Sequence, residues 1–439
     1  MASRSGSNRT AVDLKNGLVS RTIFVDHDIY QRELERIFAT CWLFLGHESQ
    51  IPKPGDYLTN YMGEDPVIVV RDGAGKIRVL LNSCRHRGMK VCRADGGNAQ
   101  SFTCAFHGWT YGVDGALIAV PQHKDAYYGE LDLTRHGLKE ARVATYGGLI
   151  FGSWGEAAET LDAYLGELRW YFDVMLERLL GGMEVIAGQQ RYTMAANWKI
   201  ASENFAGDNY HLPHSHGSIF RLDMRQLNPV NPMQYKSMER FYNVATANGH
   251  GLCGICVGDE RYEADLALAR TMGPEIVDYV EASHARLKQR LGPRQAGIHA
   301  LGFANMFPNF SFNDFSALRP IGLHLWHPRA PGKLESWQWC AVDRDAPAII
   351  KEHARIDFTR VQAVSGVAAQ DDTENFEQVT EATRGAVSRR LDFNYTMGVG
   401  HDGEIALDGY PGQYGRYYSE HCQRNFYRAW AQRMGVNGG

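Results

Sequence analysis

Two short segments of the chain each place a cysteine close to a histidine. The first reads CRHRG and carries Cys84 and His86; the second reads CAFHGW and carries Cys104 and His107, with seventeen residues between His86 and Cys104. Two cysteines and two histidines could hold one tetrahedral zinc ion. Their spacing fits better a [2Fe–2S] cluster, in which two cysteines hold one iron and two histidines hold the other. A glycine follows each pair and suits a tight loop around such a cluster.

A second group of metal-ligand side chains lies in ENFAGDNYHLPHSH, residues 203–216, which contains His211, His214 and His216. Residues three apart share a helix face, which favours His211 with His214. Pro213 disfavours the helical conformation in the residue before it, so we expect the helix to end near His211. Beyond that point helical spacing does not choose between His214 and His216.

Together these motifs resemble those of the large (α) subunits of the Rieske non-haem iron aromatic-ring-hydroxylating oxygenases. The resemblance covers nearly the whole chain and rests on the cluster motifs, on NWK at 197–199, EN at 203–204, Asp208, YH at 210–211 and a later pair of aspartates. In many members four residues separate the two histidines that bind a mononuclear iron. The resemblance therefore implies His211 and His216 as iron ligands, with His214 as the alternative.

The resemblance also implies a carboxylate ligand far along the chain. It lies in VSGVAAQDDTENFE, residues 364–377, where the motif falls on Asp372 and the alternative is Asp371. Two histidines and one carboxylate on one face of Fe(II) leave other positions open, so that O2 and substrate can both approach the metal.

Two further residues of the histidine segment have implied roles. Asp208 precedes His211 by three residues, which would put both on one helix face and let the carboxylate orient the imidazole. The resemblance implies more, namely a trimeric ring of large subunits in which Asp208 links His211 to His107 of the neighbouring chain and so carries electrons between subunits. It also implies that Asn204 lies beside the iron.

The implied activity is that of the terminal oxygenase in an aromatic dioxygenase system. Each chain would contain one Rieske [2Fe–2S] cluster and one mononuclear Fe(II), and both atoms of O2 would be added to an aromatic ring to give a cis-dihydrodiol. The resemblance further implies a small β subunit in an α3β3 assembly, with a ferredoxin and a reductase as electron donors.

The substrate that we expect is a bicyclic or polycyclic aromatic hydrocarbon or heteroarene. Position 368 is alanine, where some naphthalene-type relatives carry a large aromatic residue, and a small side chain could enlarge the pocket. No cluster of arginine or lysine marks a pocket for a carboxylate. The alternatives are monooxygenation, or oxidation of an aromatic acid such as salicylate or phthalate, which the motifs do not separate. A non-catalytic Rieske electron carrier would need no second set of metal ligands.

Composition and charge indicate which classes of partner and which cellular compartment to expect. The formal net charge is −4 and no basic block is present, so we expect neither a nucleic acid nor an anionic membrane as partner. The first ten residues lack the apolar stretch of a signal peptide, and no window approaches the ~18 apolar residues of a membrane span. We therefore expect a cytoplasmic protein whose eight cysteines are thiols or metal ligands. The CGIC pair, Cys253 and Cys256, is interpreted as buried thiols.

The elements that must position these residues change in character along the chain. From 51 to about 154, hairpins at 67–81 and 110–120 and one or two strands in 141–154 predict a small all-β domain. After residue 155 the pattern predicts an α+β domain of helix-grip type, with helices around an antiparallel sheet. Its expected helices are 159–180, most of 262–291, 346–364 and 373–387, and its expected extended segments are 184–200 and parts of 303–344. GVGHDG, residues 398–403, matches G-x-G-x-x-G but is interpreted as a loop.

The prediction for the whole chain is thus an α+β protein in three parts. Residues 1–40 form an N-terminal segment that packs on the catalytic domain and contains a helix in 26–40, capped by Asp26 or Asp28. Residues 41–156 form the Rieske domain, and residues 157–439 form the catalytic domain with the mononuclear iron.

Overall fold

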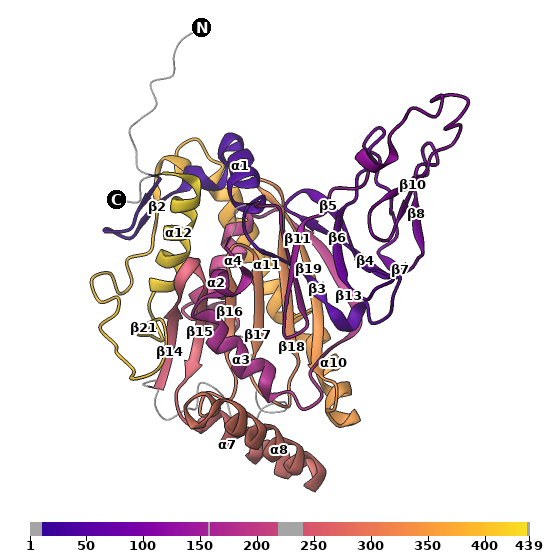
Figure 1. The fold of residues 1–439 in the computed structure, drawn as a ribbon. Helices are drawn as coiled ribbons and strands as arrows, with labels where there is room; N and C mark the ends of the chain where they lie inside the picture. Colours follow the sequence, from indigo (N-terminus) through magenta and orange to yellow (C-terminus); the bar gives the residue numbers. More distant parts are fainter. Residues whose placement is uncertain (1–10, 157–158, 218–239, 437–439) are drawn as a thin grey trace. The chain divides into compact units, whose positions relative to one another are not determined.

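The computed structural model of the protein describes residues 11–156, 159–217 and 240–436 (Figure 1). The first ten residues, from which we inferred that no signal peptide is present, lie outside these ranges. The chain divides into two compact units, one of residues 38–161 and one that joins residues up to 37 with those from 162 onward. Within the described ranges, no helix has the length and apolar character needed to cross a membrane.

The unit of residues 38–161 is built from three small antiparallel sheets, ordered β6-β5-β4-β7, β10-β9-β8 and β11-β12-β3. The elements are β3 (Leu43–His47), η3 (Glu48–Gln50), β4 (Asp56–Met62), β5 (Asp65–Arg71), β6 (Ile77–Leu81), β7 (Gly96–Asn98), β8 (Ser101–Thr103), β9 (Thr110–Gly112), β10 (Leu117–Ala119), η4 (Leu133–Arg135), β11 (Arg142–Tyr146) and β12 (Leu149–Ser153). Both predicted hairpins are confirmed, as β5–β6 and β9–β10, and the segment 141–154 forms two strands. The all-β character of this unit follows from its short β-branched runs separated by glycine turns.

The second unit contains an eight-stranded antiparallel sheet ordered β13-β19-β18-β17-β16-β15-β14-β21 and a three-stranded sheet ordered β1-β2-β20. Its strands are β1 (Val12–Asp13), β2 (Leu18–Ser20), β13 (Met183–Met194), β14 (Phe241–Ala245), β15 (Gly251–Cys256), β16 (Gly302–Met306), β17 (Phe310–Asp314), β18 (Ile321–Ala330), β19 (Lys333–Asp343), β20 (Asp392–Asn394) and β21 (Gln413–Arg416). The expected strands in 303–344 are confirmed, and so is the α+β class.

Helices pack around this large sheet (Figure 1). They are η1 (Arg21–Phe24), α1 (His27–Glu33), the π-helical η2 (Leu34–Phe38), α2 (Leu161–Leu165), α3 (Leu168–Arg178), α4 (Trp198–Gly207), α5 (Leu212–Ser215), η7 (Ala247–Gly249), α7 (Glu260–Met272), α8 (Pro274–Leu291), α9 (Pro293–Ala296), α10 (Ala348–Val361), α11 (Val367–Thr383), η8 (Ser388–Arg390) and α12 (His421–Met434). Helix α4 lies against β15 and β16, and α12 lies against α4.

A buried carboxylate joins three of these helices. Glu33 at the end of α1 accepts hydrogen bonds from Lys199 Nζ of α4 at 2.6 Å and from the indole N–H groups of Trp198 at 2.9 Å and Trp430 at 2.7 Å. The Lys199 and Glu33 side chains are fully buried. The N-terminal helix is therefore fixed to α4 and α12. It starts as expected at Asp26, whose side chain accepts the N–H of Ile29.

Three sequence-based boundaries need correction. The helix expected over 159–180 is two helices, α2 and α3, because Gly166 between them has φ of 49°. The extended segment expected over 184–200 ends at Met194, since Asn197 caps α4 through its side chain, which accepts the N–H of Lys199. Helix α11 begins at Val367 rather than 373. The expectation that most of 262–291 is helical is confirmed by α7 and α8, which are separated at Gly273.

Candidate metal centres

The two Cys/His loops of the 38–161 unit have the same backbone geometry. In each, the cysteine N–H donates to the carbonyl five residues later at 2.8 Å, and the following glycine N–H donates back to the cysteine carbonyl at 2.9 Å. The glycines, Gly88 and Gly108, have φ of 78° and 74°, a region that favours glycine. At Gly108 a Cβ would also lie 2.8 Å from Pro121 Cγ. These loops turn Cys84 and Cys104 inward.

The four side chains are arranged in two pairs. The cysteines are buried in the core of their unit, at 4% and 2% exposure, whereas the histidines are partly exposed. His86 Nδ1 and His107 Nδ1 lie 3.1 Å apart. A single zinc would draw all four ligand atoms within about 4 Å of one another, given bonds of about 2.0–2.3 Å. No such group forms here among the described residues, so the arrangement fits a two-iron cluster with cysteines on one iron and histidines on the other.

Tyr111 supports the buried side of this site. Its hydroxyl accepts the backbone N–H of Arg85 at 2.9 Å and contacts Cys84 Sγ at 3.3 Å. When Cys84 is a thiolate ligand its sulfur can only accept, so the Tyr111 hydroxyl would donate to it. A hydrogen bond to sulfur is one means by which a protein tunes such a cluster. The sequence analysis did not identify Tyr111.

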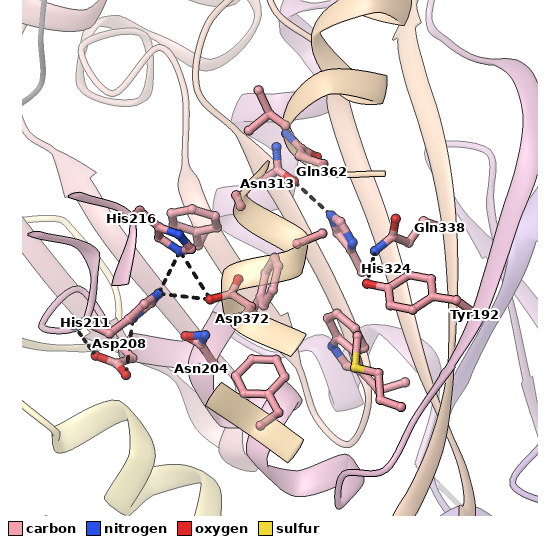
Figure 2. A pocket seen from close by; sticks show the side chains of 18 of the residues that line it. Tyr192, Asn204, Asp208, His211, His216, Asn313, His324, Gln338, Gln362 and Asp372 are labelled. Carbon is pink, nitrogen blue, oxygen red and sulfur yellow. Dashed lines mark hydrogen bonds and ion pairs between the residues drawn. The ribbon is translucent and has the colours of Figure 1, made fainter. Parts of the chain in front are cut away.

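In the second unit, three of the expected iron ligands converge. His211, His216 and Asp372 form the one group of three or more metal-ligand side chains, among the described residues, whose ligand atoms all lie within 4.8 Å. The two Nε2 atoms are 3.2 Å apart, and Asp372 Oδ1 lies 3.4 Å from His211 Nε2 and 3.2 Å from His216 Nε2 (Figure 2). Asp372 Oδ1 is buried and has no aligned hydrogen-bond donor.

These separations are those of three ligands on one face of a metal. Bonds of about 2.1 Å meeting at roughly right angles place ligand atoms about 3 Å apart. Two neutral imidazoles would otherwise direct lone pairs at each other across 3.2 Å, an arrangement that a cation between them makes favourable. Two imidazoles and one carboxylate are the donor set of non-haem Fe(II) oxygenases. The residues therefore fit a mononuclear iron.

The local backbone differs from the helix that we expected to end near His211. Helix α4 ends at Gly207, and a short helix α5 spans Leu212–Ser215 with Pro213 in its first turn. Proline is tolerated there because N–H groups of the first turn have no partner within the helix. His211 immediately precedes α5 and His216 immediately follows it, whereas His214 is exposed.

Asp208 also reaches His211 differently from our expectation. It follows the end of α4 with φ of −93° and ψ of 86°, so the two residues do not share a helix face. Instead, Asp208 Oδ1 accepts the N–H groups of Tyr210 at 2.9 Å and His211 at 3.2 Å, and Oδ2 lies 3.3 Å from His211 Nδ1. This turn places a carboxylate behind the imidazole.

The neighbouring aspartate does the same for the other histidine. Asp371 Oδ2 lies 3.1 Å from His216 Nδ1, while Asp372 faces the Nε2 atoms. Both imidazoles thus have a carboxylate near Nδ1, and at His216 the hydrogen bond fixes the tautomer that leaves Nε2 free for a metal.

The electrostatics of the group favour a bound cation. Burial opposes the charged form of His211, but the nearby carboxylates of Asp208 and Asp372 outweigh it and raise its pKa to about 10. Burial alone would raise the pKa of Asp372; instead His211 and His216 lower it to about 2. Without a metal the group therefore retains a proton to balance its carboxylates, and a divalent ion would replace that proton.

A pocket with a cavity volume of about 90 Å³ opens beside the three ligands. Most of its lining is apolar: Met194, Phe205, Phe303, Phe315, Trp326, Val361, Ala368, Ala369 and Phe376. Asn204 and Asp208 line it next to the ligands, and Ala368 lines it as expected for a residue that sets its size.

The other side of the pocket is polar, which the sequence analysis missed. Figure 2 shows this set across the pocket from the histidine ligands; it comprises Tyr192, Asn313, His324, Gln338 and Gln362. Register brings them together: His324 of β18 pairs with Gln338 of β19, and Asn313 of β17 pairs with Gly322 of β18. Two further sequence-based interpretations are confirmed: Cys253 and Cys256 are buried thiols, and residues 398–403 form a loop.

Comparisons with known proteins match both units. The Rieske [2Fe–2S] domain family matches residues 41–146, and the ring hydroxylating alpha subunit (catalytic domain) family matches residues 182–436. The chain is 42% identical over 434 residues to the biphenyl 2,3-dioxygenase subunit alpha of Rhodococcus jostii (strain RHA1), covering 96% of this chain and 90% of that one. It is 41% identical over 436 residues to a benzene 1,2-dioxygenase subunit alpha of Pseudomonas putida, covering 97% and 93%. A naphthalene 1,2-dioxygenase structure with indole bound in the active site superposes with a TM-score of 0.87 at 32% identity, covering 98% and 94%.

Proposed function

Because this chain belongs to the family of ring-hydroxylating alpha subunits, we propose that it oxidises a bicyclic or larger aromatic molecule to a cis-dihydrodiol. The chain is a Rieske non-haem iron oxygenase and the terminal oxygenase component of an aromatic-ring-hydroxylating dioxygenase. Its cofactors are one [2Fe–2S] cluster and one mononuclear iron. The single observation that carries the proposed substrate size is the largely apolar pocket beside His211, His216 and Asp372.

The proposed ligand sets are those of the sequence analysis. Cys84, His86, Cys104 and His107 would hold the cluster, and His211, His216 and Asp372 would hold the mononuclear iron. Their pairing, burial and separations support these assignments. We correspondingly propose residues 41–156 as the Rieske domain, residues 157–439 as the catalytic domain, and residues 1–40 as a segment that packs on the latter.

When bound, the cluster supplies electrons and the mononuclear iron supplies the chemistry that activates O2. The chain's own residues do the rest. The aromatic and aliphatic lining holds a flat ring and excludes bulk water. Asp371 accepts the Nδ1 proton of His216, and Asp208 Oδ2 lies 3.3 Å from His211 Nδ1, so that both Nε2 atoms face the metal position. Asn204 lines the pocket beside these ligands and is placed to contact the substrate.

Partners follow from family membership. Alpha subunits of this family work with a β subunit and receive electrons through a ferredoxin and a reductase. We propose the α3β3 stoichiometry, and that Asp208 connects His211 to His107 of the partner subunit. The position of Asp208 behind His211, with 35% of its side chain exposed, supports the second proposal.

The test is a single turnover under 18O2. Chemically reduced protein is mixed with naphthalene, biphenyl, dibenzofuran, salicylate or phthalate, and the products are analysed by mass spectrometry. We expect two labelled oxygens in a diol from a bicyclic hydrocarbon or heteroarene. One labelled oxygen, or product only from an acid, would contradict the proposal.

A further inference from the structure

The polar side of the pocket contains hydrogen-bonding groups that are buried and neutral. Asn313, His324 and Gln338 are each at most 2% exposed, and the pocket lining includes no lysine or arginine. A pocket for an unsubstituted hydrocarbon gains nothing from such groups, because burying an amide or imidazole without a partner costs free energy. Their burial therefore indicates a ligand that hydrogen-bonds to them.

The backbone makes room for this set at Gly322. A Cβ there would lie 2.1 Å from Gln362 Oε1, 2.3 Å from Asn313 Oδ1 and 2.9 Å from His324 Nε2. Any larger residue at 322 would therefore displace the polar groups. The His324 ring is also held in place, since it stacks on Trp326 with centroids 5.8 Å apart and planes 14° from parallel.

The hydrogen bonds that the polar side chains make with one another show which of their donors and acceptors remain available to a ligand. Burial lowers the pKa of His324 to about 4, so the ring is neutral near pH 7. Its Nε2 pairs with Asn313 Oδ1 at 3.0 Å. Because an amide oxygen only accepts, the proton is on Nε2, and Nδ1 is an acceptor without a partner.

The glutamines add two more acceptors. Gln338 Nε2 donates to the Tyr192 hydroxyl at 3.1 Å, which leaves Gln338 Oε1 without a partner. Gln362 Oε1 has no partner in hydrogen-bond geometry either, although Gln362 lies close enough to His324 to oppose the lowering of its pKa. Among the fully buried atoms of this set, these three acceptors compare with one donor without a partner, Asn313 Nδ2. The polar side of the pocket is thus rich in acceptors.

We propose that the natural substrate is an aromatic molecule bearing a neutral hydrogen-bond donor, a phenolic hydroxyl or an N–H group, at the end that lies against His324, Gln338 and Gln362. This inference rests on the proposed function and narrows its substrate class. The donor anchors one end of the molecule and leaves the other ring beside His211, His216 and Asp372. A carboxylate at the anchored end would face acceptor lone pairs with no cation nearby, and is excluded.

The test compares biphenyl with 4-hydroxybiphenyl, 4-methoxybiphenyl and biphenyl-4-carboxylate, using the complete oxygenase with its electron donors. We expect kcat/KM for the hydroxy compound to exceed that for biphenyl by about 10- to 100-fold, because unpartnered buried acceptors penalise a ligand without a donor. The methoxy compound keeps the oxygen but lacks the donor and should lose this advantage. Equilibrium dialysis of the oxidised holoenzyme should show the same order in Kd without turnover.

Two variants test whether the preference for hydroxybiphenyl comes from the polar side of the pocket. His324→Phe and Gln362→Leu should each bring the hydroxybiphenyl-to-biphenyl ratio close to 1 within the same preparation. Gln370→Leu on exposed α11 surface is the matched control and should leave the ratio as in the wild type. A ratio of 1 or below in the wild type overturns the inference, as would a high ratio that both variants retain. Failure to oxidise any of the four compounds would instead contradict the proposed function.

Discussion

At the scale of single residues, each iron-ligand imidazole has its own carboxylate. Asp208 lies behind His211 and Asp371 behind His216, both close to Nδ1. The consecutive aspartates Asp371 and Asp372 thus have different contacts, because successive residues of helix α11 point about 100° apart. The two histidines differ in the same way: His216 belongs to the group of three metal-ligand side chains, whereas His214 is exposed to solvent.

The iron content of variants distinguishes His216 from His214 as the iron ligand. We expect His216→Ala to lose the mononuclear iron, because the remaining two ligands no longer enclose a metal, while His214→Ala keeps it. Iron and acid-labile sulfide are measured on purified protein, with sulfide as the internal control for an intact cluster. Iron loss in His214→Ala alone would contradict the ligand assignment.

The affinity of variants for Fe(II) distinguishes the roles of Asp371 and Asp372. Asp372→Ala should abolish binding of the mononuclear iron, whereas Asp371→Ala should weaken it by roughly 10- to 100-fold, the usual effect of removing a group that orients a ligand. Titration of iron-depleted protein with Fe(II) under anaerobic conditions gives both values. Equal losses in the two variants would mean that both aspartates bind the metal.

At the scale of elements, the Glu33–Lys199 pair joins α1 to α4 and α12. Lys199→Met leaves the Glu33 carboxylate buried with only two indole donors, and we expect a loss of about 3–5 kcal/mol in the free energy of unfolding. Lys351→Met is the control, since its pair with Glu184 is about one-third exposed and should contribute below about 1 kcal/mol. Denaturant unfolding measures both; similar losses would show that burial of the pair does not matter.

At the scale of the whole molecule, one buried acid makes stability depend on pH. Burial raises the pKa of Glu203 to about 8, although Tyr395 donates to its Oε1 at 2.7 Å. The folded state therefore keeps a proton that the unfolded chain releases above a pKa near 4.5. This contribution to stability is complete below about pH 4.5 and is lost as the pH rises through about 8.

The variant that tests this pH dependence is Glu203→Gln, because glutamine has nearly the shape of the protonated carboxyl group and cannot ionise. Between pH 5 and 8 its free energy of unfolding should fall less than that of the wild type, as measured by denaturant titration at several pH values. Parallel curves for the two proteins would show that Glu203 ionises normally in the folded state.

Much of the molecule could be predicted from the sequence because the decisive signals are local. The Cys84/His86 and Cys104/His107 segments are each a single loop, and their spacing is enough to indicate a cluster. Hairpins such as β5–β6 form between neighbouring segments joined by a glycine turn, so their pairing needs no distant information. Errors occurred where one residue ends an element, as Gly166 and Asn197 do.

The polar side of the pocket depended on the tertiary structure alone. Asn313, His324, Gln338 and Gln362 belong to four different elements and none belongs to a motif. The first three meet because β17, β18 and β19 pair in one particular register, and a shift of one residue would turn their side chains to the opposite face of the sheet; Gln362 reaches them from the end of helix α10. The sequence by itself determined the family, the cluster loops and the types of metal ligand, since these depend on short-range spacing. What the pocket recognises depends on the register of consecutive strands and on how helices α10 and α11 pack beside them, which only the folded chain decides.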